Sequence, residues 1–394
     1  MSNYQCGKNQ SFSREVNNKL VLEKLLTKPY SQTELAEELF LSNATMSSIA
    51  KDLLGIGVIK VLNTSSKVGL GRRQVFYTIN ENYGLILAVN ISNFQATIAV
   101  ANLKEEILAK EIIDIDKYDL NAIYSIILLS SKLLLNGDFK DVELKSIVIS
   151  LPGRVNSKTG ELILSKQFDP ALFKEKNFIV NAFKKQYPNA EVISMNDINL
   201  AAYAEMSQGE LIDVDNAIFI SIDTGIGGSL IINHKLFEGD QGYAGEFGLI
   251  KVEENGTYDY LDELVSFRIL SKKGEVLTHT KIKSRSELIN LYNTNREFKK
   301  IVLESGKTLG RAIKSLIETL DISTVIISGR AVEFDGDYID AIKQELKTLI
   351  YPPVLKFSSL KREGKIKGAT SVGLKTILMK SISKWGSNIW VHWN

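Results

Sequence analysis

The sequence predicts an α/β protein in which a small N-terminal winged helix-turn-helix precedes a larger, two-lobed α/β region. Three observations support this prediction. Three short helical patterns and a hairpin pattern occupy residues 1–80, strand and helix patterns then alternate twice, and glycine-containing motifs follow several strands. Alternating strands and helices form layered lobes, and clefts between lobes bind small molecules, so we expect a ligand site in the larger region.

The composition is that of a globular protein without a membrane span. A chain of 394 residues is longer than one hydrophobic core usually supports, so two or three domains are expected. There is no run of about eighteen apolar residues, and the first ten residues lack the apolar stretch of a signal peptide. We therefore predict a cytoplasmic protein. The single cysteine, Cys6, can form neither an intrachain disulfide nor a thiolate metal site.

Charge is distributed unevenly along the chain. The net charge is +2, but residues 1–80 carry ten Lys and Arg against six Asp and Glu, which leaves this segment at +4 and the remainder at −2. Contacts with phosphate supply most of the non-specific affinity for nucleic acids. A basic N-terminal segment on a slightly acidic body indicates an anionic polymer as the partner of that segment only.

Three helical patterns lie in the first 54 residues. Ser31 and Glu34 have the spacing of a capping box, which predicts the start of the second helix. That helix should end in a turn at Phe40 and Leu41, and Ser42 is the predicted N-cap of the third. The residues predicted to be buried recur at helical spacing: Val21, Leu22 and Leu25 in the first helix, Leu35, Ala36 and Leu39 in the second, and Met46, Ile49, Ala50, Leu53 and Leu54 in the third.

The opposite face of the third helix is polar and mostly small. Small hydrogen-bonding side chains near a helix N-terminus can enter the major groove and meet base edges and phosphates. We therefore predict DNA contacts from this face; the alternative is a structural three-helix unit without DNA. The residues concerned are Asn43, Thr45, Ser47, Ser48 and Lys51.

A hairpin pattern follows the third helix. Two β-prone runs, 58–63 and 74–79, flank a polar, glycine-containing loop, which is the pattern of a wing. Arg72 and Arg73 lie in that loop and are predicted to reach a minor groove, where the negative potential favours arginine. The alternative is that both arginines only solubilise the hairpin.

From residue 85 onward, strand-like and helical segments alternate. Polar residues Asn196 and Asp197 directly follow the strand-like run 191–195, so they should lie at the C-terminal end of a strand. An amide beside a carboxylate suits the donors and acceptors of sugar hydroxyls; the alternative is an N-cap for helix 198–208. The other expected segments are strands at 85–91, 96–101, 107–112, 144–150, 217–222, 230–232 and 324–328, and helices at 120–135 and around 299–320.

Four motifs resemble those of the ROK family (repressors, open reading frames and kinases) and occur in that family's order. They are Leu-Pro-Gly-Arg-Val-Asn at 151–156, Asn-Asp-Ile-Asn-Leu-Ala-Ala at 196–202, Asp-Thr-Gly-Ile-Gly-Gly at 223–228 and Gly-Tyr-Ala-Gly-Glu-Phe-Gly at 242–248. The resemblance covers nearly the whole chain. It implies a DNA-binding domain at 1–80 and an actin-like (ribonuclease H-like) ATPase or sugar-kinase fold at 81–394, with lobes at about 85–200 and 201–394.

The resemblance also implies a sugar site. Asp197 matches the general base of the family's kinases, and Asp262 stands where the family usually has a glutamate. For Glu246 the alternative is a solvated loop acid, and for the glycines it is ordinary turns. The implied sugar-binding residues are Gly153, Asn196, Asp197, Glu246 and Asp262, and the implied vestigial phosphate loop contains Gly225, Gly227 and Gly228.

The chain departs from the family's kinases at the nucleotide and zinc sites. Asn90 and Ser92 stand where the family has the carboxylate and glycine of its first phosphate loop, and the adenosine-side motif is altered to Ser328-Gly329-Arg330. Metal-bound ATP therefore loses two supports. Leu249 replaces the family's zinc-binding histidine, and the closely spaced cysteines are missing. We expect neither a metal nor a cofactor, and we assign no catalytic residue.

These observations predict a sugar-responsive DNA-binding regulator, a repressor of carbohydrate-utilisation genes, whose partners are operator DNA, a monosaccharide and a second copy of the chain. One alternative is an ATP-dependent sugar kinase of the glucokinase or N-acetylglucosamine kinase type, which Asn90 and Ser92 disfavour. Another is a ligand-free regulator whose large domain serves dimerisation or protein docking. The joint presence of Asn196, Asp197 and Glu246 argues against that second alternative.

Overall fold

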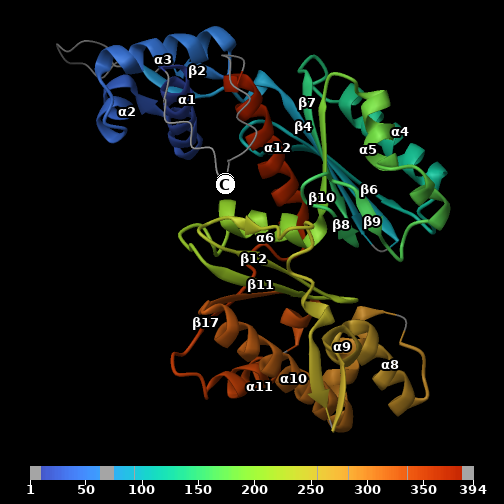
Figure 1. Cartoon of the computed structure of the whole chain (residues 1–394). Coiled ribbons are helices and arrows are strands. Elements are labelled where there is room, and N and C mark those ends of the chain that lie inside the picture. Colours follow the sequence, from blue (N-terminus) through green and yellow to red (C-terminus); the bar gives the residue numbers. More distant parts are fainter. Residues whose placement is uncertain are drawn as a thin grey trace. The chain divides into compact units, whose positions relative to one another are not determined.

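A computed structural model describes residues 10–62, 75–92, 94–254, 256–282, 284–334 and 336–383 (Figure 1). These residues form two compact units, and the chain passes between them several times. The first unit contains the described residues up to Ser150, Gln167–Ser194 and the described residues after Gly368; the second contains Leu151–Lys166 and Met195–Gly368.

The N-terminal part of the first unit has three helices and a small sheet. The sheet order is β1-β3-β2, and both pairings are antiparallel. These elements are α1 (Gln10–Thr27), β1 (Tyr30–Ser31), α2 (Gln32–Glu38), α3 (Asn43–Ile56), β2 (Ile59–Leu62) and β3 (Phe76–Ile79). The predicted hairpin strands are thus confirmed in shortened form, and the predicted loop between them lies outside the described residues.

Local capping explains where α2 and α3 begin. The Ser31 side chain accepts a hydrogen bond from the Glu34 amide, and the Glu34 side chain accepts one from the Ser31 amide, which confirms the capping box. Ser42 caps α3 through the Thr45 amide, as predicted. The turn between the two helices contains Phe40, whose φ is 54°.

The predicted apolar faces of these helices form a core. All the residues predicted to be buried are so except Leu39 and Leu54, which are half-buried at its margin. The same core includes Ile86 of β4 and the last part of α12 (Gly364–Ser383), where Leu374 and Ile377 are buried. The N-terminal helices therefore do not have a separate core, but share one with later segments of their unit.

A five-stranded sheet with order β10-β7-β4-β5-β6 forms the rest of the first unit. β4, β5 and β6 are antiparallel neighbours, and β7 is parallel to β4. Helix α4 packs against β5 and β6. The elements are β4 (Leu85–Ser92), β5 (Gln95–Ala101), β6 (Ile107–Asp114), α4 (Leu120–Asn136), β7 (Leu144–Leu151), α5 (Phe178–Gln186) and β10 (Glu191–Asn196). The segments predicted here are confirmed with ends shifted by at most two residues.

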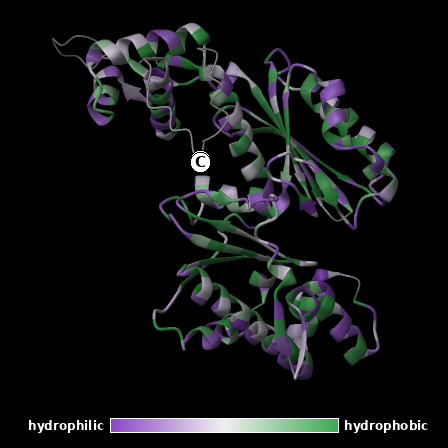
Figure 2. Ribbon diagram, viewed as in Figure 1, coloured by the Kyte–Doolittle hydropathy of each residue, from purple (hydrophilic) through white to green (hydrophobic). Residues whose placement is uncertain are grey.

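The second unit contains another five-stranded sheet, of order β13-β12-β11-β16-β17. Its strands β11 and β16 are mainly hydrophobic and buried (Figure 2). Residues alternate between two cores along β11: Ile218 and Ile220 belong to the core with α10 and α11, and Phe219 to the core with α6. The central elements are α6 (Asp197–Gln208), β11 (Ala217–Ile222), β12 (Ile226–Ile231), β13 (Leu236–Phe237), α10 (Arg296–Leu320), β16 (Thr324–Gly329), α11 (Gly336–Leu346) and β17 (Val354–Phe357).

Shorter elements of the second unit are β8 (Arg154–Val155), β9 (Leu162–Leu164), β14 (Lys251–Glu254), β15 (Thr257–Tyr260), α7 (Leu261–Val265), α8 (Phe267–Thr278) and α9 (Arg285–Thr294). β12 begins at Ile226, four residues before the predicted strand at 230–232, because the glycines of its first half pair with β11. Within the described ranges, no helix is long and apolar enough to cross a membrane.

Candidate functional site

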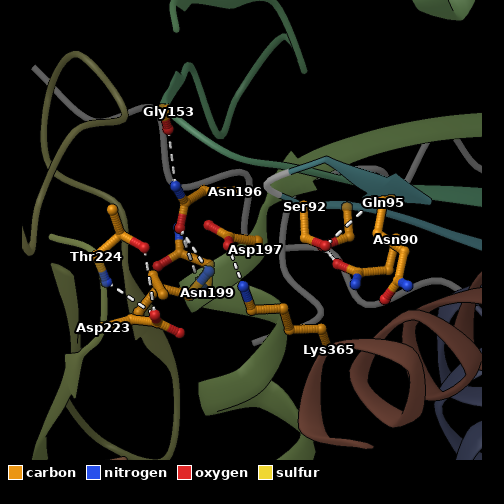
Figure 3. Close-up of polar contacts among 12 residues, drawn as sticks. Asn90, Ser92, Gln95, Gly153, Asn196, Asp197, Asn199, Asp223, Thr224 and Lys365 are labelled. Carbon is orange, nitrogen blue, oxygen red and sulfur yellow. Dashed lines mark hydrogen bonds and ion pairs between the residues drawn. The ribbon is translucent and has the colours of Figure 1, made fainter. Parts of the chain in front are cut away.

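The polar pair Asn196 and Asp197 lies where β10 meets α6 (Figure 3). Asn196 is the N-cap, since its side-chain oxygen accepts hydrogen bonds from the amides of Ile198 at 2.8 Å and Asn199 at 3.1 Å. Its side-chain nitrogen donates to the Gly153 carbonyl oxygen at 2.8 Å. The helix therefore begins one residue earlier than predicted, and Asn196 has the structural role that the sequence left open as an alternative.

Asp197 is buried, with 8% of its surface exposed, and it is held in an ion pair. The Lys365 ammonium, from the first turn of α12, donates to Asp197 Oδ2 (Figure 3). Lys365 was not among the predicted site residues, because 168 residues separate it from Asp197 and no local motif marks it. A sugar hydroxyl that donates to Oδ2 must therefore share this oxygen with Lys365 or displace it.

A second ion pair lies in the same unit. Arg330 Nε is 2.8 Å from Asp223 Oδ1, and the Thr224 amide donates to the same oxygen at 2.8 Å. The charges of Asp223 and Arg330 both act on Lys365. We call Asp197, Asp223, Arg330 and Lys365 the acid–base cluster. Its acids are paired with cations of the chain itself.

Lys365 keeps its charge in this cluster. Burial acts to lower the pKa of its ammonium, but the Asp197 charge and hydrogen bond, together with the Asp223 charge, outweigh burial and the repulsion by Arg330. The pKa of Lys365 therefore lies above its ordinary value. The Lys365 side chain is consequently protonated across the physiological pH range.

The glycine motif at 225–228 is mostly strand, which differs from the expected loop. Gly227 and Gly228 lie within β12, in antiparallel register with β11. A Cβ atom on Gly228 would lie 2.7 Å from the Phe219 backbone oxygen. Of the three glycines only Gly225 lies in the turn between the strands. Close packing of the hairpin therefore accounts for Gly228 without a phosphate ligand.

Asp262 supports that hairpin. Its Oδ1 accepts a hydrogen bond from the Ile226 amide at 2.7 Å, and its Oδ2 accepts one from Arg268 Nη2 at 3.0 Å. Both carboxylate oxygens thus already bond to groups of the chain. Asp262 therefore fixes the start of β12 through the Ile226 amide. The expected contact between Asp262 and a sugar remains a prediction.

Glu246 lies beside Arg154 on the same unit. Arg154 Nε is 3.9 Å from Glu246 Oε1, and the guanidinium carbon of Arg154 is 5.4 Å from the centre of the Tyr243 ring. Arg154 Nε is itself buried and makes no hydrogen bond. The Glu246 side chain is 42% exposed; its partial burial raises the pKa of the carboxyl, and the Arg154 charge offsets only part of this effect. Glu246 is therefore an incompletely paired acid with capacity for another donor.

Gly153 is required by its backbone. Its φ is +113°, and an added Cβ atom would lie 2.3 Å from the Leu164 backbone oxygen of β9. Its own carbonyl accepts the hydrogen bond from Asn196 described above. Gly153 thus places the β8–β9 hairpin next to the start of α6. Two of the predicted sugar-site residues, Gly153 and Asn196, are bonded directly to each other.

The polar residues at the altered phosphate loop bond within the first unit. Asn90 is buried and its side-chain oxygen accepts a hydrogen bond from the Ser150 hydroxyl at 2.9 Å. The Ser92 hydroxyl donates to the Gln95 carbonyl oxygen at 3.1 Å, across the tight turn that joins β4 and β5 (Figure 3). Asn90 therefore links β4 to its parallel neighbour β7, and Ser92 links β4 to β5.

The candidate DNA-contacting residues form one surface of α3. The Asn43, Ser47, Ser48 and Lys51 side chains are exposed. Thr45 is half-buried, and its hydroxyl lies 2.8 Å from the Ser42 hydroxyl. Arg72 and Arg73, also predicted to contact DNA, lie outside the described residues. Four of the five predicted DNA-contacting residues of α3 are thus exposed on that helix.

Metal ligands are not clustered in the part of the chain that the structure describes. No group of three or more His, Cys, Asp or Glu side chains within those ranges could hold a metal ion. The acids described above are each close to a basic residue or to backbone amides, which is the environment of structural ion pairs and caps. The expected absence of bound zinc remains a prediction, which elemental analysis of the purified protein would test.

Comparison with known proteins identifies the family. A model of the ROK family matches residues 86–373, which is most of the chain, so this protein belongs to the ROK family. It is similar to the xylose repressor of Bacillus spizizenii, at 23% identity over 378 residues that cover 94% of this chain and 97% of the relative. It is also similar to the xylose repressor of Staphylococcus xylosus, at 27% identity over 82% of this chain and 81% of that protein.

Solved structures show the fold. The crystal structure of a ROK family transcriptional regulator, described as a homologue of the Escherichia coli MLC protein, has a TM-score of 0.79 and 21% identity over 94% of this chain and 98% of that chain. A ROK family glucokinase from Streptomyces griseus, in complex with glucose and AMPPNP, has a TM-score of 0.62 and 19% identity over 74% of this chain and all of its own. The protein therefore has the α/β fold shared by ROK regulators and sugar kinases.

The environment of Glu246 predicts a pH-dependent effect on stability. Because its pKa is raised in the folded state, folding is favoured while the carboxyl is protonated, and this advantage is lost as the pH rises through the folded-state pKa. We expect Glu246→Gln to raise the midpoint of thermal unfolding at pH 7 relative to the parent. The difference should shrink towards zero near pH 4, where the carboxyl is largely protonated in both states.

Thermal unfolding of both proteins between pH 4 and pH 8 checks this expectation. The matched control Glu253→Gln removes an exposed carboxylate from β14 and measures the effect of lost charge alone. A variant that is less stable than the parent at pH 7 would show that the Arg154 ion pair dominates over burial.

Proposed function

We propose that this chain is a transcription regulator that binds operator DNA through its N-terminal domain and responds to a monosaccharide bound by its larger domain. The observation that carries the proposal is the extent of similarity. The match to the xylose repressor of Bacillus spizizenii covers 94% of this chain and so includes N-terminal residues ahead of the family match. The glucokinase likeness covers 74%. The DNA-binding transcriptional dual regulator NagC of Escherichia coli is similar over 81% of this chain.

The proposed DNA-binding domain is a winged helix-turn-helix at residues 1–80. Helices α2 and α3 with the short sheet support this assignment, and α3 presents Asn43, Ser47, Ser48 and Lys51 as the recognition surface. Thr45 is the weaker member of that set, because its hydroxyl lies within hydrogen-bonding distance of Ser42. Arg72 and Arg73 complete the proposed contacts from the wing.

The proposed effector domain spans 81–394, with lobes at about 85–200 and 201–394. In it, Asp197 and Glu246 supply acceptors for sugar hydroxyls, while Asn196, Gly153 and Asp262 hold the surrounding backbone. Several relatives are named xylose repressors, so D-xylose is the first sugar to test. The protein is proposed to act in the cytoplasm as a homodimer that reads two half-sites.

Sugar phosphorylation is not part of the proposed function. A general base must accept the proton of the attacked hydroxyl, and one of the two Asp197 carboxylate oxygens, Oδ2, already accepts a hydrogen bond from the Lys365 ammonium. Asn90 bonds to Ser150 of β7, Ser92 bonds within the β4–β5 hairpin, and neither supplies a carboxylate to position a metal. The site therefore supports binding more readily than group transfer.

Replacing Arg72 and Arg73 together with Ala should weaken binding to DNA. The duplex is selected from a random library with the full-length protein, and its affinity is measured by fluorescence anisotropy at several salt concentrations. Each lost phosphate contact should reduce the slope of log affinity against log salt by about one. We expect a slope reduced by about one to two and a lower affinity at every salt concentration.

The double variant Lys132→Ala, Lys140→Ala is the matched control, because it removes the same charge from exposed positions of the larger domain. It should bind as the parent does. Equal affinity and slope for the parent and the Arg72, Arg73 variant would remove the wing from the proposed interface.

Phosphorylation of sugars should be absent or very slow. A coupled assay of ADP release with Mg-ATP and common aldoses, D-xylose included, measures it. Kinases typically turn over at about 1–100 s⁻¹, and we expect a rate well below about 1 s⁻¹. A rate at or above that value for any aldose would support the kinase alternative instead.

A further inference from the structure

The Asp197–Lys365 ion pair joins the first residue of α6 to the first turn of α12. Asp197 side-chain exposure is 11% and that of Lys365 is 26%, so the contact is largely shielded from water. Shielding of this kind makes an ion pair geometrically demanding, and loss of either partner leaves the other charge uncompensated. The pair is therefore sensitive to any group that competes for Asp197.

Close backbone packing keeps these two helices together. A Cβ atom on Gly368 of α12 would lie 1.9 Å from the Leu200 carbonyl oxygen of α6, and one on Gly364 would lie 3.6 Å from the Ala201 Cβ. Glycine at 368 thus allows α12 to lie directly against α6. Because the two helices pack so closely, loss of the Asp197–Lys365 contact should shift the first turn of α12 and cannot be accommodated by small side-chain movements alone.

The later part of α12 belongs to the first unit. There, the Thr370 and Ser371 hydroxyls donate to Glu105, which anchors the helix to the turn between β5 and β6. Beyond this anchor, α12 contributes to the hydrophobic core that contains the buried face of α3. The residues of that shared core include Leu374, Ile377, Leu378 and Ile382 of α12 and Met46, Ile49 and Leu53 of α3.

We propose that Lys365 is the positioning residue that couples sugar binding at Asp197 to the N-terminal helices, with α12 as the connecting element. The inference rests on the proposed function. In this proposal a sugar hydroxyl takes the place of the Lys365 ammonium on Asp197 Oδ2, so the intact pair belongs to the arrangement that has no sugar at Asp197. For a repressor this is the arrangement that binds DNA. The sugar displaces Lys365 from Asp197, α12 shifts once this contact is lost, and the shift alters the packing of the core beneath α3.

A double-mutant cycle in the absence of sugar tests this coupling. Lys365→Met and Asp197→Asn each break the pair with little change in side-chain size. Affinity is measured for the duplex that the parent selects from a random library. Each single variant should bind about fivefold or more weakly than the parent, because the pair that favours the DNA-binding arrangement is gone. The double variant should bind no more weakly than either single one, since both remove the same interaction.

Two further variants separate coupling from general damage. Lys367→Met removes a lysine two residues further along the same helix, from a surface pair with Glu363, and should bind DNA within twofold of the parent. Lys365→Arg keeps the positive charge and should retain most of the affinity. Hydrogen exchange of the α12 amides without DNA provides a second measurement, and Lys365→Met should accelerate it.

The outcomes are distinct. Affinity of Lys365→Met within twofold of the parent, together with unchanged exchange in α12, would overturn the inference. So would losses that multiply in the double variant, or a Lys365→Arg variant that binds as weakly as Lys365→Met. A parent protein that selects no duplex from the library would instead refute the proposed function itself.

Discussion

Helix α12 packs against α6 at its N-terminal end and against the N-terminal helices at its C-terminal end. The arrangement of the proposed site depends on this double packing. Its first turns carry glycines that fit against the backbone of α6, and Lys365 in the same turns pairs with Asp197. Its later turns carry the aliphatic residues of a core shared with α3. One helix therefore packs by small residues at one end and by large apolar residues at the other, which ties the sugar-site helix and the N-terminal helices to the same element.

Most polar groups of the proposed sugar site are already bonded within the chain, and Glu246 is the incompletely paired exception. Asn196 caps α6 and holds Gly153, and Asp262 fixes the start of β12. Such a site is preorganised, because its side chains do not need to be ordered when a ligand binds. A sugar that binds at Asp197 shares or replaces the Lys365 contact, whereas Glu246 can accept a donor without losing a hydrogen bond.

Local features of the sequence predicted a large share of the fold. The capping box at Ser31 and the N-cap at Ser42 are short-range patterns, and the buried face of α3 follows from helical periodicity. Most strands of the two five-stranded sheets were predicted by their apolar runs. The exceptions are the short strands β13 and β17, which were not predicted, and the first half of β12, where glycines conceal the strand pattern.

The rest depended on long-range contacts that leave no local pattern. Lys365 lies far from Asp197 in sequence, and nothing near it indicates an ion pair. The Arg330–Asp223 pair is of the same kind, although Arg330 stood within a motif that differed from the family's. The sharing of one core by α3 and α12 was equally hidden, because both helices show only an ordinary apolar face.

Reciprocity between sugar and DNA tests the central claim most directly. If D-xylose changes DNA affinity through a shared equilibrium, DNA must change D-xylose affinity by the same factor. Isothermal titration of D-xylose into the full-length protein, with and without a saturating amount of the selected duplex, measures this factor. The account predicts that D-xylose binds about 5- to 150-fold more weakly to the DNA-bound protein, within the usual range of such coupling. Equal D-xylose affinity in the two titrations, in a protein that binds both ligands, would contradict it.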